Sequence, residues 1–297
     1  MAVDMEFCLL GPLVVRCGAI AVPVPRGKQR AVLAALLLSA NKPVRIDGLA
    51  EALWGAEPPR SARVTLANYV KRLRGAFGDD GRDRLRTMPQ GYLIEVGASE
   101  LDVFRFETLT ATARAAARDG SWAQASKRAQ GALSLWRGQP LADVESEALA
   151  QREVPRLAGL RLQALETRLD ADLHLGGHAD VIPELRHLAD SYPLHENLTA
   201  LLMLALYRAG RQAEAQAVYR QMRHVLNEEL GTEPGREIRE LHRKILTADP
   251  ALTLPAPQAG GHRHLRVVPR EFPAAGTAGR CRTGRYPRRR APGPPGG

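Results

Sequence analysis

Short apolar runs separated by glycine and proline open the chain, and they predict a small sheet. The runs cover residues 7–11, 13–16 and 19–22, and turn-forming residues lie between them. Leucine and valine then recur at helical spacing over residues 27–39, which predicts a first helix. The pattern therefore changes from strands to a helix within the first quarter of the chain.

Two more helices are predicted in the region that follows. A brief extended link over residues 44–46 precedes Asp47, which can cap a short helix ending at Leu53. Ser61 is a plausible N-cap for a third helix that runs to about residue 77. Apolar residues spaced 4, 3 and 4 apart give this helix a buried face, formed by Leu66, Val70, Leu73 and Phe77. Its other face is polar and basic, with Arg63, Asn68, Lys71, Arg72 and Arg74.

A β-hairpin is predicted after the third helix. Two extended segments, residues 85–88 and 92–96, are joined by the turn sequence Pro89-Gln90-Gly91. Strands, three helices with a basic third, and then a hairpin are the element order of a winged helix with an N-terminal sheet. This order predicts DNA binding, because a helix fits the major groove and a hairpin can lie along the neighbouring backbone.

Residues 102–248 read as helical almost throughout and predict about seven helices. A repeated Gly-x-x-Ala-x-(Ala/Val) sequence begins at Gly120, Gly176 and Gly210, each time between two predicted helices. The last two copies are 34 residues apart, which is the tetratricopeptide period. The alternative is an irregular helical bundle in which glycine merely ends helices.

The charge is spread unevenly along the 297 residues, whose formal net charge is +10. Residues 1–97 carry 14 basic and 9 acidic side chains, whereas residues 98–250 carry 19 and 22. Residues 251–297 carry 9 and 1, and they include 8 prolines and 8 glycines. We therefore expect a basic first domain with an anionic partner, a helical second domain, and a disordered basic tail with these three boundaries. The alternative is that arginine is simply a common surface residue in this protein.

Several classes of protein are not supported by the sequence. No apolar stretch is long enough to cross a bilayer, and the start lacks a signal-peptide pattern, so we expect a soluble, cytoplasmic, nucleoid-associated protein with no membrane partner. Cys8, Cys17 and Cys281 predict neither a disulfide framework nor a zinc site. All eight histidines lie at or beyond His174, and no Walker-type phosphate loop occurs. We expect no enzymatic activity, no cofactor and no metal.

Asn68, Lys71 and Arg72 are the candidates for base contact on the third helix. Asparagine suits adenine or a phosphate, and the two cations suit guanine or a phosphate. The alternative is that these residues, with Arg74, are only the solvated face of an amphipathic helix. Lys28, Gln29 and Arg30 lie at the start of the first predicted helix, where backbone N–H groups favour phosphate.

Long motifs in both halves resemble one known family. Leu10-Gly-Pro-Leu-Val-Val, the run from Lys28 to Leu38, Leu53-Trp-Gly, Asn68-Tyr-Val-Lys-Arg-Leu-Arg and Gly91-Tyr-Leu are similar to the DNA-binding half of Streptomyces antibiotic regulatory proteins. Leu135-Trp-Arg-Gly-Gln-Pro-Leu, Glu166-Thr-Arg-Leu-Asp-Ala-Asp-Leu and the run from Leu202 to Ala215 resemble the family's bacterial transcriptional activation domain. The resemblance covers about residues 5 to 250.

This resemblance implies a mainly helical protein with a small β component, in which an OmpR-type winged helix precedes a tetratricopeptide-like domain. It implies a transcriptional activator of a secondary-metabolite (antibiotic) gene cluster. The implied partners are double-stranded promoter DNA with direct repeats near the −35 element, RNA polymerase holoenzyme including its sigma factor, and side-by-side copies of the protein itself.

The resemblance also extends the set of candidate DNA contacts. It places Asn68, Lys71 and Arg72 next to bases, and it makes Arg63, Thr65, Tyr69 and Arg74 candidates for phosphate contact. Arg86 and Tyr92 are candidates on the wing. A function of another class stays open from the residues alone, namely a helical-repeat scaffold whose basic domain binds nucleic acid or protein without sequence preference.

Overall fold

The computed structural model describes residues 5–253, and the predicted basic tail lies almost entirely outside them. The chain begins with three antiparallel strands, β1 (Met5–Cys8), β2 (Val14–Cys17) and β3 (Ile20–Val22), in the order β1-β2-β3. Gly18, with φ of 58°, provides the tight turn between β2 and β3. The predicted N-terminal sheet is confirmed.

Three helices follow, α1 (Lys28–Leu38), α2 (Ile46–Trp54) and α3 (Ala62–Arg82). The prediction that Asp47 caps α2 is wrong, because Arg45 is the N-cap and Asp47 lies in the first turn. Its carboxylate is still near the positive end of the helix dipole. Helix α3 extends beyond the predicted end, but Gly78 has non-helical backbone angles and breaks it there.

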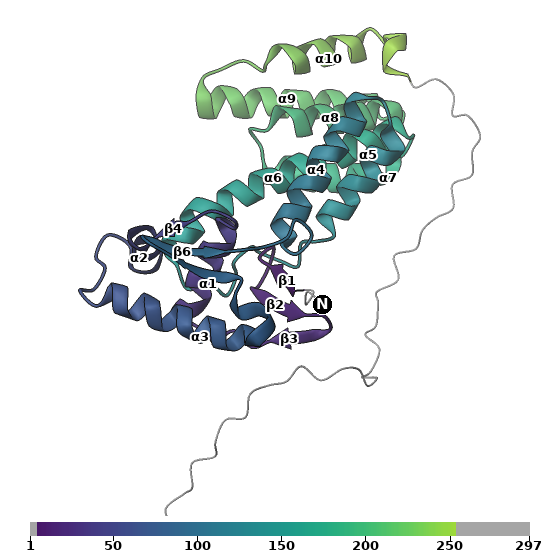
Figure 1. Ribbon diagram of the computed structural model, residues 1–297. Coiled ribbons are helices and arrows are strands. Elements are labelled where there is room, and N and C mark those ends of the chain that lie inside the picture. Colours follow the sequence, from purple (N-terminus) through teal and green to yellow (C-terminus); the bar gives the residue numbers. More distant parts are fainter. Residues whose placement is uncertain (1–4, 254–297) are drawn as a thin grey trace, which may run out of the picture.

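The predicted hairpin is confirmed as β5 (Leu85–Met88) and β6 (Gly91–Ile94). A short strand, β4 (Val44–Arg45), pairs with β6 and completes a second antiparallel sheet in the order β4-β6-β5. A side chain at Gly91 would meet the Val44 carbonyl oxygen at 1.9 Å, so only glycine allows β4 to approach so closely. The two sheets and α1–α3 form the winged-helix part of Figure 1.

Seven α-helices make up the rest of the described chain, as predicted. They are α4 (Asp102–Arg118), α5 (Trp122–Leu133), α6 (Glu147–His174), α7 (His178–Ser191), α8 (Glu196–Arg208), α9 (Gln212–Leu230) and α10 (Arg236–Leu246), followed by the short 3₁₀ turn η1 (Pro250–Leu252). Gly120, Gly176 and Gly210 have φ of 70°, 91° and 75°, so each copy of the repeated sequence begins at a left-handed turn between consecutive helices.

The two large hydrophobic cores of the described chain divide inside α6. The first core joins the sheet and α1–α3 to Phe106, Leu149 and Leu157 of the following helices. The second core begins at Leu169 and continues to Leu252. Because α6 is 28 residues long, it contributes to both cores and connects the winged helix to the outer helices α7–α10 (Figure 1).

Candidate nucleic-acid interface

Helix α3 turns one side to the core and the other to solvent. Its inward side is formed by the predicted residues Leu66, Val70, Leu73 and Phe77, each at most 7 % exposed. Asn68, Lys71 and Arg72 are exposed on the outward side, and Arg63 is exposed in the first turn of the helix, toward the wing turn. Within residues 5–253, none of these four side chains forms a hydrogen bond or an ion pair. Their donors are therefore available to an external partner.

Arg74 lies at the edge of this outward face and ties α3 to the wing. Its Nε donates to the Leu85 carbonyl oxygen at 2.8 Å, and its Nη2 donates to Thr87 Oγ1 at 2.8 Å. These bonds fix the wing strand β5 against the helix. We therefore assign Arg74 to positioning the wing, and we do not retain it as a candidate for phosphate contact.

The remaining candidates on α3 and the wing differ in their exposure. Thr65 and Tyr69 are half-buried, and Tyr69 packs against the first core. Tyr92 is only 8 % exposed and belongs to the same core. Arg86 is exposed and pairs with Glu95 at 3.1 Å, an exposed contact that is weak enough to be exchanged for a phosphate.

A hollow of about 390 Å³ lies between the start of α3 and the turn of the wing. Arg45 comes to it from β4, and Arg60 and Arg63 come from the residues around the start of α3, while Pro89 and Gln90 form its wing side. Sequence reasoning missed Arg60, although it precedes Arg63 by only three residues, and it missed Arg45, which only the fold brings beside Arg63. Asp47 also lines the hollow and lies 3.8 Å from Arg45. Three arginines against one carboxylate leave an excess of positive charge where a winged helix would face a DNA backbone.

The three candidates at the start of α1 are directed into the protein instead. The Lys28 ammonium donates to the Leu53 carbonyl oxygen and lies 5.7 Å from the centre of the Trp54 ring. Gln29 is 8 % exposed. Arg30 pairs with Asp143, which belongs to the loop between α5 and α6. Since this helix start is occupied by groups of the chain itself, we do not retain it as a phosphate site.

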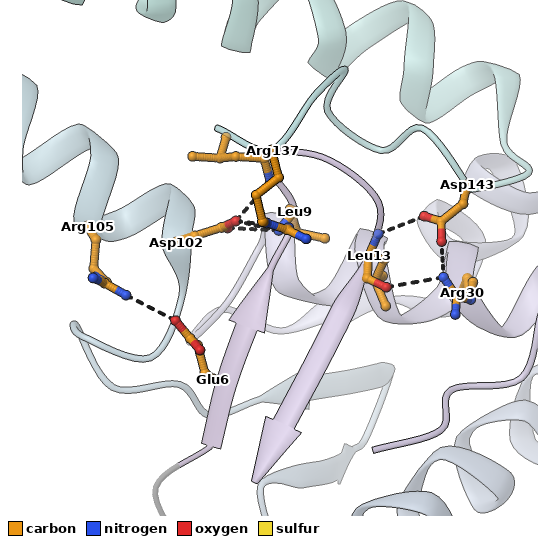
Figure 2. A network of polar contacts seen from close by, with 9 residues as sticks. Glu6, Leu9, Leu13, Arg30, Asp102, Arg105, Arg137 and Asp143 are labelled. Atoms are coloured by element: carbon orange, nitrogen blue, oxygen red, sulfur yellow. Dashed lines mark hydrogen bonds and ion pairs between the residues drawn. The ribbon is translucent and has the colours of Figure 1, made fainter. Parts of the chain in front are cut away.

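Asp102, at the start of α4, is the centre of a polar network that joins the two parts of the chain (Figure 2). Its two carboxylate oxygens both accept the Leu9 N–H at 2.8 Å, and one also accepts the Leu10 N–H at 2.9 Å. The Arg137 guanidinium lies 3.6 Å away. At 3 % exposure, Asp102 satisfies backbone groups at the end of β1 that would otherwise be buried without acceptors.

A second part of the same network lies nearer to α1 (Figure 2). Asp143 accepts the Leu13 N–H at 2.7 Å and pairs with Arg30, whose guanidinium also donates to the Leu13 carbonyl oxygen at 3.1 Å. Ser146 Oγ donates to the carbonyl oxygen of Ala52 in α2. We call Asp102, Arg137, Asp143 and Ser146, with these partners, the interdomain seam. It holds the winged helix and the helical region in one fixed arrangement.

The electrostatics of the seam indicate a structural role. Burial raises the pKa of the Asp102 carboxyl above its ordinary value, although the N–H groups of Leu10 and Leu9 and the charge of Arg137 favour ionisation. Burial, together with Asp102 and Glu6, also raises the pKa of the Cys8 thiol to about 11. At neutral pH this thiol stays protonated and is a poor nucleophile.

The described part of the chain offers no evident place for a metal. No group of three or more histidine, cysteine, aspartate or glutamate side chains within residues 5–253 is arranged to hold an ion. His174 ends α6 and stacks on Trp122 at 3.7 Å, and His178 begins α7 beyond the break at Gly176. In addition, no described helix is both long and apolar enough to cross a membrane.

Comparison with protein families gives two matches along the chain. A model described as "Transcriptional regulatory protein, C terminal" matches residues 25–94. A model described as "Bacterial transcriptional activator domain" matches residues 101–246. The first covers α1–α3 and the wing but not the strands β1–β3, and the second covers the helices from α4 to α10.

Individual relatives match across both parts. The chain is 38 % identical to the regulatory protein DnrI of Streptomyces peucetius over 262 residues, which cover 86 % of this chain and 96 % of DnrI. It is 41 % identical over 252 residues to the regulatory protein AfsR of Streptomyces griseus, covering 85 % of this chain but only 26 % of AfsR. The chain thus spans nearly the whole of DnrI and about a quarter of AfsR.

A solved structure has the same arrangement. Mycobacterium tuberculosis EmbR, determined in complex with a low-affinity phosphopeptide, superposes with a TM-score of 0.79 at 34 % sequence identity. The match covers 84 % of this chain and 66 % of the EmbR chain.

Proposed function

Since the chain belongs to the Streptomyces antibiotic regulatory proteins, a family of transcriptional regulators that are in general not enzymes, we propose that it is a sequence-specific activator. In this proposal it binds direct repeats in promoter DNA near the −35 element and recruits RNA polymerase. The proposed targets are genes of an antibiotic-type biosynthetic cluster.

The exposed residues of α3 are the main support for this proposal. Arg63, Asn68, Lys71 and Arg72 are exposed and have no partner among residues 5–253, while the opposite side of the helix is fully packed. A helix with long polar and basic side chains on its free side suits the major groove. We assign Asn68, Lys71 and Arg72 to base edges, where sequence is read.

The surroundings of α3 supply the sequence-independent part of binding. We assign Arg45, Arg60 and Arg63, which line the hollow beside the wing turn, to backbone phosphates. Arg86 extends this set along the wing. Thr65 and Tyr69 stay candidates for phosphate contact at the margin of the helix. Lys28, Gln29, Arg30, Arg74 and Tyr92 are left out, because contacts within the chain or burial engage them.

Activation in this proposal involves binding energy and no chemistry. The interdomain seam fixes the helical region relative to α3. Binding of α3 to DNA therefore also determines the position of helices α4–α10 relative to the promoter. Neighbouring repeats would then place two copies of the protein side by side. The complex would stabilise RNA polymerase, including its sigma factor, at the adjacent promoter.

Competition with random DNA tests the proposal most simply. The purified chain is bound to the promoters that flank its own gene, and unlabelled random duplex is added at constant salt. A specific reader should prefer its promoter by about 10³-fold or more. Equal displacement by random DNA would instead indicate a basic scaffold with salt-sensitive, sequence-blind binding and would contradict the proposal.

A further inference from the structure

Val64 is the most exposed of the large apolar side chains in residues 5–253, with 66 % of its surface open to solvent. It lies in the first turn of α3. Single exposed apolar residues are common on protein surfaces and need no explanation by themselves. The neighbours of Val64, and not its exposure alone, suggest what it contacts.

The neighbours of Val64 are the residues assigned to DNA. Asn68 and Lys71 follow it at four and seven positions, so all three lie on one stripe of the helix. This stripe is opposite the buried side formed by Leu66, Val70 and Leu73. Val64 is therefore at the middle of the outward face and not at its margin.

The charge around Val64 favours a nucleic acid over an apolar protein surface. Arg60 and Arg63 precede it, and Lys71 lies two turns further along. A protein partner that buried a valine would need a continuous apolar patch, whereas the large side chains next to Val64 are polar or basic. An anionic partner with a small apolar group at its surface fits this pattern better.

We propose that Val64 packs against the C5-methyl group of a thymine in the major groove. That methyl is the apolar group that base pairs present in this groove, and it distinguishes thymine from cytosine. Val64 and Asn68 are about 6 Å apart along the helix axis, so they face base pairs about one or two steps apart. The assignment rests on the proposed function and adds to it one base pair of the DNA site that the protein would recognise.

Uracil substitution tests this contact, because replacing thymine by uracil removes the methyl group alone. Dissociation constants are measured for the full chain on its bound promoter site, with each thymine replaced in turn and salt held constant. One buried methyl group corresponds to about a fourfold change in Kd. We expect uracil at one position in each repeat to weaken wild-type binding by about that factor.

Val64→Ala identifies the side chain that makes the contact. Alanine favours a helix more than valine does, and the site is exposed, so this variant should fold normally. It should bind the thymine site about fourfold more weakly and should show no further loss with uracil at the sensitive position. Leu230→Ala is the matched control, since Leu230 is 56 % exposed on α9; it should keep the full uracil effect.

The outcomes separate this inference from the proposed function. If promoter DNA is preferred over random DNA but no uracil substitution weakens binding, Val64 does not read a thymine methyl. The same conclusion follows if Val64→Ala keeps the uracil effect. If promoter DNA is not preferred at all, the proposed function fails, and this assignment fails with it.

Discussion

Arginines on α1 and α3 have the same chemistry and opposite surroundings. The Arg30 side chain is 18 % exposed, pairs with Asp143 and donates to the Leu13 carbonyl oxygen. Arg63 and Arg72 are exposed and have no ion pair within the part of the chain that the structure describes. The acid that engages Arg30 comes from 113 residues later in the chain. A carboxylate that is distant in the sequence thus determines whether an arginine is engaged within the fold or stays available to an external partner.

The interdomain seam and the outward face of α3 should therefore respond differently to mutation. Substitutions in the seam should lower the free energy of unfolding and change DNA affinity little while the protein stays folded. Substitutions on the outward face should lower DNA affinity and change the free energy of unfolding little, since exposed residues contribute little to stability. Four predictions, given in decreasing order of size, test whether the two regions differ in this way.

The largest effect is expected for Asp102→Ala. The buried N–H groups of Leu9 and Leu10 lose their acceptor, and leaving such groups unsatisfied lowers the free energy of unfolding by about 2–5 kcal/mol. Urea unfolding followed by circular dichroism measures this. Glu6→Ala is the matched control in the same network, because the Glu6–Arg105 pair is about 40 % exposed and should contribute less than about 1 kcal/mol. Equal losses in the two variants would contradict the structural role of Asp102.

Arg72→Ala should weaken binding to the promoter site by about 1–3 kcal/mol, because one base contact is removed. Preference at one base position should relax at the same time. Fluorescence anisotropy with the promoter site and single-base variants measures both effects. Arg220→Ala, an exposed arginine on α9, is the control and should change neither. Unchanged binding by Arg72→Ala would show that the outward face of α3 is misassigned.

Arg63→Ala should have a smaller and sequence-independent effect. Removing one phosphate contact weakens promoter and random DNA alike and reduces the slope of log K against log salt by about 1. Titrations at several salt concentrations measure this slope. A loss confined to the promoter site would instead mean that Arg63 reads a base.

The smallest effect concerns the titration of Asp102. Because burial raises its pKa in the folded state, the folded protein holds this proton more tightly than the unfolded chain does. The contribution of Asp102 to stability is therefore greatest below its ordinary pKa of 3.8 and falls as pH rises through the raised value. The free energy of unfolding of wild type relative to Asp102→Asn should decline over that range. A relative increase would mean that hydrogen bonding outweighs burial.

The sequence predicted the elements better than it predicted their roles. Local periodicity was sufficient for α1, α3, the wing hairpin and the seven later helices, because each of these patterns lies within one segment. The spacing of Leu66, Val70 and Leu73 correctly identified the inward side of α3. The roles of side chains whose partners are distant in the sequence could not be predicted. The main example is the ion pair of Arg30 with Asp143.

The same reason explains the errors and omissions around the candidate site. Arg74 is basic and lies on α3, but its bonds to Leu85 and Thr87 depend on where the hairpin folds back. Arg45 lies 18 residues before Arg63 in the sequence, and only the fold brings it to the hollow beside Arg63. Neither their burial nor their neighbours can be read from local spacing.

Paired cations hold the interdomain seam, and we propose that unpaired cations on α3 read DNA. Arg30→Ala and Arg72→Ala test it directly when the free energy of unfolding and the Kd for promoter DNA are measured on both. We predict that Arg30→Ala lowers the free energy of unfolding by about 1–2 kcal/mol and changes Kd less than threefold, whereas Arg72→Ala shows a large loss of affinity at unchanged stability. A stable Arg30→Ala protein with the larger loss of promoter binding would show that these roles of Arg30 and Arg72 are misassigned.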